Sequence, residues 1–280
     1  MSLHGLSVGM QSMKVNKSVC IVVPIYRQLT ESELISLQSL ENHLSQYTIS
    51  FLSSQKWDLT TTLKHEWKIV EAHWLNSHQS YNRMMYSESF YRWYENYEWI
   101  FIFQLDGLIL NGDLERWTAQ NQYDFIGAPG IAYDSEGRAL HVKRGFNGGV
   151  SLRRTSAFLN IFKKRVIVSV EGESFERFKW FRKCKLPFKT CVVKKIFELN
   201  SSLNRYYLYR IKGLMEDGYW SYAVRDQQKS LRCASESESM AFCFDRSPRY
   251  LYSLTSRLPF AAHAWEKWEV DFWKEMIHFE

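Results

Sequence analysis

The sequence lacks any long apolar run. No stretch of the 280 residues approaches the roughly 20 apolar residues that a membrane-spanning helix requires. Residues 1–17 also contain no apolar segment of the kind found in a secretory signal. We therefore expect a soluble, cytoplasmic protein whose first 17 residues form a flexible tail.

Two sequence patterns that would define other classes of protein are also missing. The five cysteines form no CxxC pair and no cysteine–histidine cluster with zinc-ligand spacing, which argues against a structural zinc site. Their odd number, without a secretory signal, indicates reduced thiols. The segment after the first apolar run, VPIYRQLTES (23–32), contains no glycine. A nucleotidyltransferase with a glycine- and lysine-rich phosphate loop is therefore unsupported.

What is present is an alternation of strand and helix patterns. Ser18–Pro24 is a β-branched run typical of a strand covered on both faces. Thr30 and Glu33 form a capping-box pattern for a helix that ends near Leu44. Further strands are predicted at 48–52, 67–70, 98–103, 124–126 and 241–244, and further helices at 76–94, 155–162 and 215–226. This order predicts an α/β fold with a mostly parallel sheet flanked by helices, in one domain over 18–280.

Four polar positions could carry chemistry. Asp106 follows the strongest predicted strand, where ligands bind in parallel sheets, and could hold a cation that bridges two phosphates. Its alternative role is to cap a turn. Asn147, Gly148 and Gly149 form a predicted glycine turn that could approach a sugar closely, or could simply be a tight hairpin turn.

The other two positions lie in the second half of the chain. Glu216 and Asp217 stand at a predicted helix start, where a carboxylate either caps the helix or acts as a general base. His263 lies among apolar residues, where a histidine is more often packed in the core than bound to a metal.

The order and spacing of these motifs resemble the GT-A, Rossmann-like glycosyltransferases. They are especially similar to a bacterial glycosyltransferase-like family, labelled as a domain of unknown function and found among polysaccharide-assembly proteins. The matching segments are VVPIYR (22–27), SYNRMMYSESFY (80–91), IFQLDG (102–107), YDFIGAP (123–129), FNGGVSLR (146–153), EDGYWS (216–221) and AAHAWEKW (261–268).

The resemblance implies a role for each matching position. Pro24 and Tyr26 would lie near the nucleotide base, and Asn82 and Arg83 would flank the nucleotide. Asp106 matches the last Asp of the DxD metal motif, with His263 as a second metal ligand. The remaining implied roles are sugar or acceptor contacts for Asn147, Gly148 and Gly149, and that of catalytic base for Asp217, with Glu216 beside it.

One departure from the family pattern concerns the metal. Gln104 stands where many GT-A enzymes have the first Asp of DxD, so a Mn²⁺ or Mg²⁺ ion would depend on Asp106, His263 and the donor diphosphate. The residues after the acidic pair also differ from the usual apolar continuation. The choice of Asp217 over Glu216 as the base therefore stays open.

A basic, aromatic insertion interrupts the alternation at about 163–212. It contains fourteen Lys and Arg residues against four acidic residues. It could contact anionic lipid at the inner membrane face, grip an acidic glycan or an acceptor diphosphate, or form a solvated basic face. Nucleic acid is not an expected partner, because no nucleic-acid motif accompanies the charge.

The resemblance thus implies an inverting, hexosyltransferase-like enzyme. It would move a sugar from a nucleotide-diphosphate sugar to a hydroxyl on a glycan or lipid-linked glycan acceptor, in bacterial surface polysaccharide biosynthesis. The alternative is a non-catalytic carbohydrate- or nucleotide-binding protein on the same scaffold, which an incomplete DxD motif would suit.

Overall fold

The computed structural model describes residues 16–119, 122–163, 215–224 and 231–277. The predicted tail lies outside these residues up to residue 15, and the predicted basic insertion lies outside them from residue 164 onward. Residues 16 and 17, which were predicted to belong to the tail, are part of the first strand.

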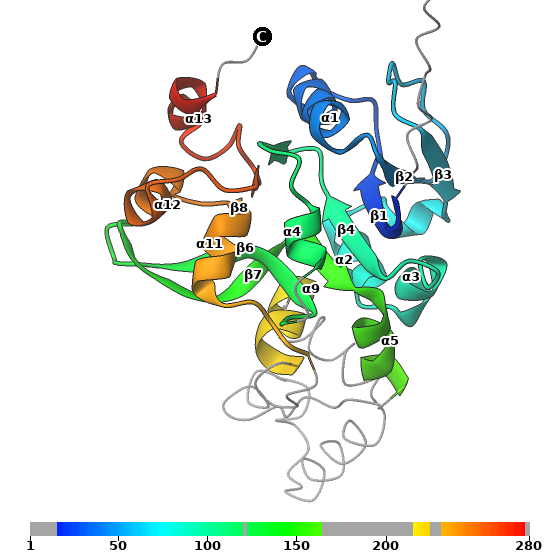
Figure 1. The fold of residues 1–280 in the computed structure, drawn as a ribbon. Helices are drawn as coiled ribbons and strands as arrows, with labels where there is room; N and C mark the ends of the chain where they lie inside the picture. The colour runs from blue at the N-terminus through cyan, green and yellow to red at the C-terminus, as the bar shows by residue number, and fades with distance from the viewer. Residues whose placement is uncertain (1–15, 120–121, 164–214, 225–230, 278–280) are drawn as a thin grey trace, which may run out of the picture.

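A six-stranded sheet forms the centre of the described structure (Figure 1). Its strand order is β3-β2-β1-β4-β7-β6. The pairings among β1, β2, β3 and β4 are parallel, whereas β7 is antiparallel to both of its neighbours. The strands are β1 (Asn16–Pro24), β2 (Tyr47–Ser53), β3 (His65–Ile69), β4 (Trp99–Phe103), β6 (Phe125–Tyr133) and β7 (Ala139–Arg154).

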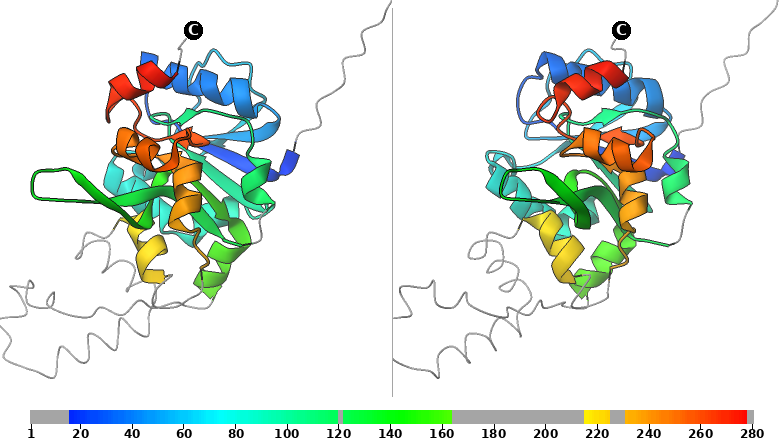
Figure 2. Two further views of the ribbon diagram at one scale, coloured as in Figure 1. Left: turned by 60° about the vertical axis from the view of Figure 1, so that its left-hand side comes forward. Right: turned by 90° about the vertical axis from the view of Figure 1, so that its left-hand side faces the viewer.

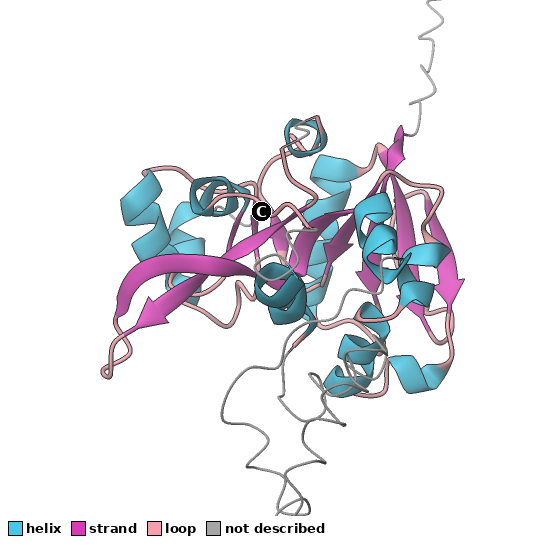
Figure 3. Cartoon of the chain, turned by 90° about the horizontal axis from the view of Figure 1, so that it is seen from below, coloured by secondary structure: helices cyan, strands magenta, loops and turns pink. Residues whose placement is uncertain are grey.

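The parallel strands reverse their order of connection at β1. The chain passes from β1 through α1 (Glu31–Leu44) to β2 on one side, and from β3 through two helices to β4 on the other. Because such crossovers are right-handed, these helices cover opposite faces of the sheet (Figures 1 and 3). The gap between the ends of β1 and β4 is thus the switch point at which α/β sheets bind ligands.

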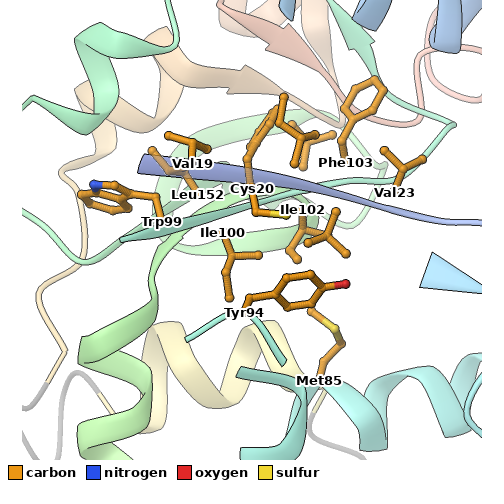
Figure 4. Packing of buried hydrophobic residues seen from close by; sticks show 14 of the residues in the cluster. Val19, Cys20, Val23, Met85, Tyr94, Trp99, Ile100, Ile102, Phe103 and Leu152 are labelled. Carbon is orange, nitrogen blue, oxygen red and sulfur yellow. The ribbon is translucent and has the colours of Figure 1, made fainter. Parts of the chain in front are cut away.

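The core is built around β1 and β4. Every residue of β4 is buried, and the described part of β1 from Val19 to Pro24 is buried as well. Figure 4 shows Val19 and Cys20 of β1 beside Trp99 and Ile100 of β4, with Val23 and Phe103 at the other end of the two strands. This double-sided burial explains why both strands lack an alternating polar pattern, and it confirms the α/β class.

The predicted helix over 76–94 consists of two helices, α2 (His78–Met85) and α3 (Glu88–Trp93). Ser87 separates them: its hydroxyl donates to the Met84 carbonyl at 2.6 Å and accepts from the Phe90 N–H at 3.2 Å. One serine therefore ends the first helix and caps the second. The apolar periodicity is the same in both helices, which is why it did not reveal the break.

Strand β7 corrects the prediction of a glycine turn at Asn147, Gly148 and Gly149 that leads into a short strand. The chain does not turn there, because β7 runs through Asn147, Gly148 and Gly149 as one continuous strand. Its pairing with β6 shifts between Ala128↔Asn147 and Gly127↔Ser151, so the glycines lie in a bulge. Beyond this bulge, β6 and β7 form a two-stranded ribbon that projects from the body of the molecule (Figure 2).

The C-terminal part of the described chain adds a small second sheet of order β5-β9-β8. The predicted strand at 241–244 is reduced to Cys243–Phe244, because Ala241 belongs to a helix. No helix among the described residues is long and apolar enough to cross a membrane. The strands of this sheet are β5 (Leu108–Ile109), β8 (Cys243–Phe244) and β9 (Ala261–Ala262).

Short helices complete the described fold. The helix predicted at 215–226 is observed as one turn followed by a π-helical segment. The remaining helices are η1 (Ala72–Trp74), α4 (Glu115–Thr118), α5 (Thr155–Lys163), α9 (Glu216–Gly218), η3 (Tyr219–Val224), α11 (Glu236–Phe242), α12 (Pro248–Thr255) and α13 (Val270–Met276).

We predict that Phe101→Ala lowers the free energy of unfolding by about 3–5 kcal/mol, measured by urea denaturation. The ring of Phe101 is fully buried, and its centroid lies 6.2 Å from that of Phe242 and 5.9 Å from that of Phe260. Ile69→Ala on β3 is the control, because Ile69 is 48% exposed. Equal losses in the two variants would contradict a joint core for β4 and the C-terminal segment.

Candidate active site

A cavity of about 430 Å³ opens at the carboxyl ends of the parallel strands. Its walls come from the segments that follow β1, β3 and β4, so it occupies the switch point of the sheet. The residues that line it include Pro24, Tyr26, Arg27, Glu33, Asn76, Ser77, His78, Tyr81, Gln104, Asp106 and Glu266.

Four predicted nucleotide-sugar residues line this cavity, namely Pro24, Tyr26, Gln104 and Asp106. Tyr26 presents a ring that is 55% exposed, which suits stacking against a flat base. The Arg27 guanidinium beside it is held by the Glu33 carboxylate, with Nη1 and Oε2 2.7 Å apart.

Asn82 and Arg83 do not line the cavity. The buried Asn82 amide accepts the Glu216 backbone N–H at 3.0 Å and donates to the His78 carbonyl at 3.1 Å. Arg83 is exposed and lies over the Trp74 ring, 5.6 Å from its centroid. Asn82 therefore links the backbone before Asp217 to the helix α2.

The residues that line the cavity from this region instead are Asn76, Ser77, His78 and Tyr81. Sequence reasoning missed them. The available signal was their position after the predicted strand at 67–70, which ends at the same sheet edge as the strand before Asp106.

Asp106 and His263 meet at the edge of this cavity. Asp106 Oδ1 and His263 Nε2 lie 3.3 Å apart, and neither atom makes a hydrogen bond within the described structure. The Asp106 side chain is 40% exposed and that of His263 is 9% exposed. A carboxylate oxygen and an imidazole nitrogen, brought together from segments far apart in the chain, thus face the same point.

Asp245 orients the imidazole. Its Oδ1 lies 3.1 Å from His263 Nδ1, and its Oδ2 accepts from the Asn147 amide at 3.2 Å. A hydrogen bond at Nδ1 fixes the ring and directs Nε2 toward Asp106. Sequence reasoning missed Asp245, although it directly follows a short apolar strand, as Asp106 nearly does.

These contacts change the pKa values of both groups. Burial lowers the pKa of His263, but the carboxylates of Asp106 and Asp245 outweigh burial and raise it to about 10. Burial raises the pKa of Asp106, whereas His263 and Lys267 lower it, and the result lies below the ordinary value. The imidazole of His263 is therefore protonated at neutral pH, and a cation that bound to Nε2 would replace this proton.

The geometry at Asp106 and His263 fits a divalent cation. Adjacent ligand atoms of an octahedral ion with bonds of about 2.1 Å lie about 3.0 Å apart, close to the 3.3 Å between Oδ1 and Nε2. No cluster of three or more His, Cys, Asp or Glu side chains that could hold a metal occurs in the described part of the chain. The remaining ligands would have to come from a substrate or water.

Gly148 and Gly149 of β7 each leave room for a different functional side chain. A Cβ atom on Gly149 would lie 2.2 Å from His263 Nε2 and 2.6 Å from Gln104 Oε1. A Cβ atom on Gly148 would lie 2.3 Å from Glu216 Oε1. The backbone at these glycines is therefore approached closely, as predicted, but by side chains of the protein that converge on β7.

Glu216 belongs to a buried ion pair. Both of its oxygens accept from the Arg153 guanidinium, at 2.8 Å and 3.0 Å. Arg153 is fully buried and also donates to the Tyr91 hydroxyl, the Ser151 hydroxyl and the Gly148 carbonyl. Burial raises the pKa of Glu216, and Arg153 opposes this shift. With both oxygens engaged, Glu216 is poorly placed to accept a proton from a substrate.

Asp217 is more accessible than Glu216 and faces a second cavity of about 350 Å³. Its carboxylate accepts from the backbone N–H groups of Gly148 at 3.3 Å and Gly218 at 2.6 Å. Burial raises the pKa of Asp217, the two N–H groups lower it, and the net value lies above that of an ordinary aspartate. Such a carboxylate is suited to act as a general base.

Residues 64–263 match the family described as "Protein of unknown function (DUF5672)". The chain belongs to this family. The matched segment includes Asp106, Asp217 and His263, so the residues that converge at β7 lie within the DUF5672 region. Among curated proteins, none matches the chain in sequence.

Solved glycosyltransferases are similar to this DUF5672 chain at low sequence identity. One is GlyE of Streptococcus pneumoniae TIGR4, whose apo form is 12% identical with a TM-score of 0.45 over 93% of this chain and 60% of GlyE. A second GlyE structure has 11% identity and a TM-score of 0.47, with 95% and 61% covered. The chain thus spans about three fifths of GlyE.

A third structure is a glycosyltransferase involved in glycosylation of the major capsid of PBCV-1. It is 11% identical with a TM-score of 0.40, over 88% of this chain and 92% of that one.

We predict that Arg153→Met lowers the free energy of unfolding by about 3–5 kcal/mol, because it leaves the Glu216 carboxylate buried without its partner. The double variant Arg153→Met, Glu216→Leu should lose less than the single variant, since both charges are then removed. Thermal and urea unfolding of Arg153→Met, Glu216→Leu and the double variant measure this. A double variant that loses the sum of the two single effects would contradict the ion pair.

Proposed function

We propose that this protein is a glycosyltransferase that moves a sugar from a nucleotide-diphosphate sugar to an acceptor hydroxyl, assisted by Mn²⁺ or Mg²⁺. The observation that supports it most is the position of the Asp106–His263 contact. It lies at the mouth of a cavity at the sheet switch point, while Asp217 faces a second cavity across β7. Two substrates could therefore meet between a cation site and a carboxylate base.

The first cavity is suited to the donor. The exposed ring of Tyr26 could stack on the nucleotide base. Asp106 and His263 would hold the cation, and the hydrogen bond from Asp245 keeps the imidazole in position. When bound, the cation would neutralise charge on the leaving diphosphate.

Asp217 is suited to activate the acceptor. Its carboxylate would accept the proton of the acceptor hydroxyl as that oxygen forms a bond to the anomeric carbon of the sugar. The bond from that carbon to the diphosphate oxygen breaks, and the nucleoside diphosphate leaves with the electron pair. Attack from the side opposite the diphosphate inverts the anomeric centre. Glu216 would position Asp217 through its bond to Arg153.

The motif resemblance further supports a setting in bacterial surface polysaccharide assembly at the cytoplasmic side, with a glycan or lipid-linked glycan as acceptor. The alternative, a non-catalytic binding protein on this scaffold, is favoured by Gln104 at the position of the first DxD acid. The two proposals differ in whether a bound nucleotide-sugar turns over.

The deciding experiment is a screen of nucleotide-sugars for binding and slow hydrolysis, with Mn²⁺ and with EDTA. We expect one nucleotide-sugar to bind only with metal. Asp106→Ala should weaken this binding roughly tenfold or more, because it removes a cation ligand. Asp217→Asn should keep binding but reduce turnover by roughly 100-fold or more, because it removes the base.

Asp58→Ala is the matched control, because Asp58 is exposed and lines neither cavity. Binding without turnover in the wild type would favour the non-catalytic alternative. If no nucleotide or nucleotide-sugar binds under any metal condition, the proposed function is wrong.

The pH profile gives a separate prediction. Because the pKa of Asp217 is raised, its carboxylate takes up a proton at a higher pH than an ordinary aspartate does. Turnover at saturating metal and donor should therefore be constant at higher pH and fall as pH decreases through this raised pKa. Turnover that holds down to the pKa of an ordinary aspartate would contradict Asp217 as the base.

A further inference from the structure

The second cavity lies on the Asp217 side of β7, and two of its lining residues connect it to the first. Asn147 and Asp245 line it, and Asp245 contacts His263, which in turn contacts Asp106 at the first cavity. The β6–β7 ribbon forms another wall, which includes Gly130 and Lys143. A molecule in this cavity would reach Asp217 without occupying the donor cavity.

Two cations line this cavity, Lys143 from β7 and Arg246 from the segment after β8. Neither forms an ion pair with a carboxylate of the described residues, and both side chains are exposed. Their positive charges are therefore available to a ligand.

Each of the two side chains packs against a neighbouring group. A Cβ atom on Gly130 would lie 3.1 Å from Lys143 Cγ and 3.3 Å from its Cε, so the lysine stem lies along the Gly130 backbone. The Arg246 guanidinium lies 4.8 Å from the centroid of the Trp268 ring. Fixed stems lower the entropy that is lost when such side chains bind an anion.

The acidic groups of this cavity have other partners. The Asp245 carboxylate is engaged by the His263 imidazole and the Asn147 amide. Asp217 is bonded to two backbone N–H groups. The cavity thus combines one proton acceptor with two cations that form no ion pair with a carboxylate of the described residues.

We propose that this second cavity selects an acceptor that carries an anionic group, either a carboxylate of an acidic sugar or a phosphate, which Lys143 and Arg246 bind. The acceptor hydroxyl then faces Asp217. This inference depends on the proposed function for the identity of the ligand as an acceptor, but the anion site itself is independent of it.

The test is calorimetric binding of four probes in buffer with EDTA, so that no cation recruits anions to Asp106. The probes are methyl glucuronide, methyl glucoside, methyl glucose-6-phosphate and inorganic pyrophosphate. We expect one anionic glycoside to bind roughly tenfold more tightly than methyl glucoside, since a charge-assisted hydrogen bond is stronger than a neutral one. The tighter anionic probe identifies carboxylate or phosphate as the natural group.

Lys143→Gln and Arg246→Gln should each weaken the anionic glycoside roughly tenfold and leave methyl glucoside unchanged. Lys56→Gln is the matched control, because Lys56 is an exposed cation that lines neither cavity. Binding that favours neither anionic glycoside over the neutral one, or that survives both substitutions, would overturn the inference. Pyrophosphate binding that is insensitive to both substitutions would likewise place the anion elsewhere.

Nucleotide-sugar binding, measured on the same protein preparations in buffer with Mn²⁺ and without EDTA, separates the two proposals. If a nucleotide-sugar binds but no anionic glycoside does, the anionic acceptor is wrong and the donor site stands. If an anionic glycoside binds through Lys143 and Arg246 but no nucleotide-sugar does, the anion site stands and the glycosyltransferase proposal is wrong.

Discussion

The buried ion pair between Arg153 and Glu216 determines where the candidate base lies. A guanidinium without access to water is tolerated only when its donors are satisfied. Here the carboxylate, the Tyr91 hydroxyl, the Ser151 hydroxyl and the Gly148 carbonyl accept from it. The pair attaches the short helix α9 to the C-terminal end of β7. Asp217, the next residue along the chain, is thereby held at the edge of the second cavity.

The bulge in β7 is the other constraint on this region. A continuous strand with side chains at residues 148 and 149 would collide with groups from three distant segments. The two glycines admit Gln104 and His263 on one side and Glu216 on the other. Because the bulge interrupts the pairing with β6, the backbone N–H of Gly148 is also free to donate to Asp217. The sheet therefore contributes to the candidate site directly.

The parallel half of the fold was predictable because its signals are local. The β-branched run of β1, the apolar run of β4 and the capping box at Thr30 each specify an element within a few residues, and the structure has all three. The position of Asp106 at a ligand-binding edge followed from the order of the strands. The family resemblance also pointed to His263, and the structure brings the two together.

The parts that sequence reasoning missed depend on pairing between distant segments. The residues around Arg153 do not indicate that its guanidinium is buried, because its partner, Glu216, lies 63 residues away in the sequence. The continuity of β7 through Asn147 and both glycines is likewise imposed by β4 and β6. The role of Asp245 becomes apparent only from its contact with His263. The function of such residues can be recognised only when the positions of their partners are known.

The contribution of both halves of the chain to the site affects how the protein is made. The wall formed by Pro24 and Tyr26 is synthesised well before Glu266, which lines the same cavity, and before His263, which contacts Asp106 at its edge. Contacts of such long sequence separation form late. A nascent chain on the ribosome can assemble the parallel strands early, yet it gains its complete cavity only when the segment that carries His263 and Glu266 has emerged.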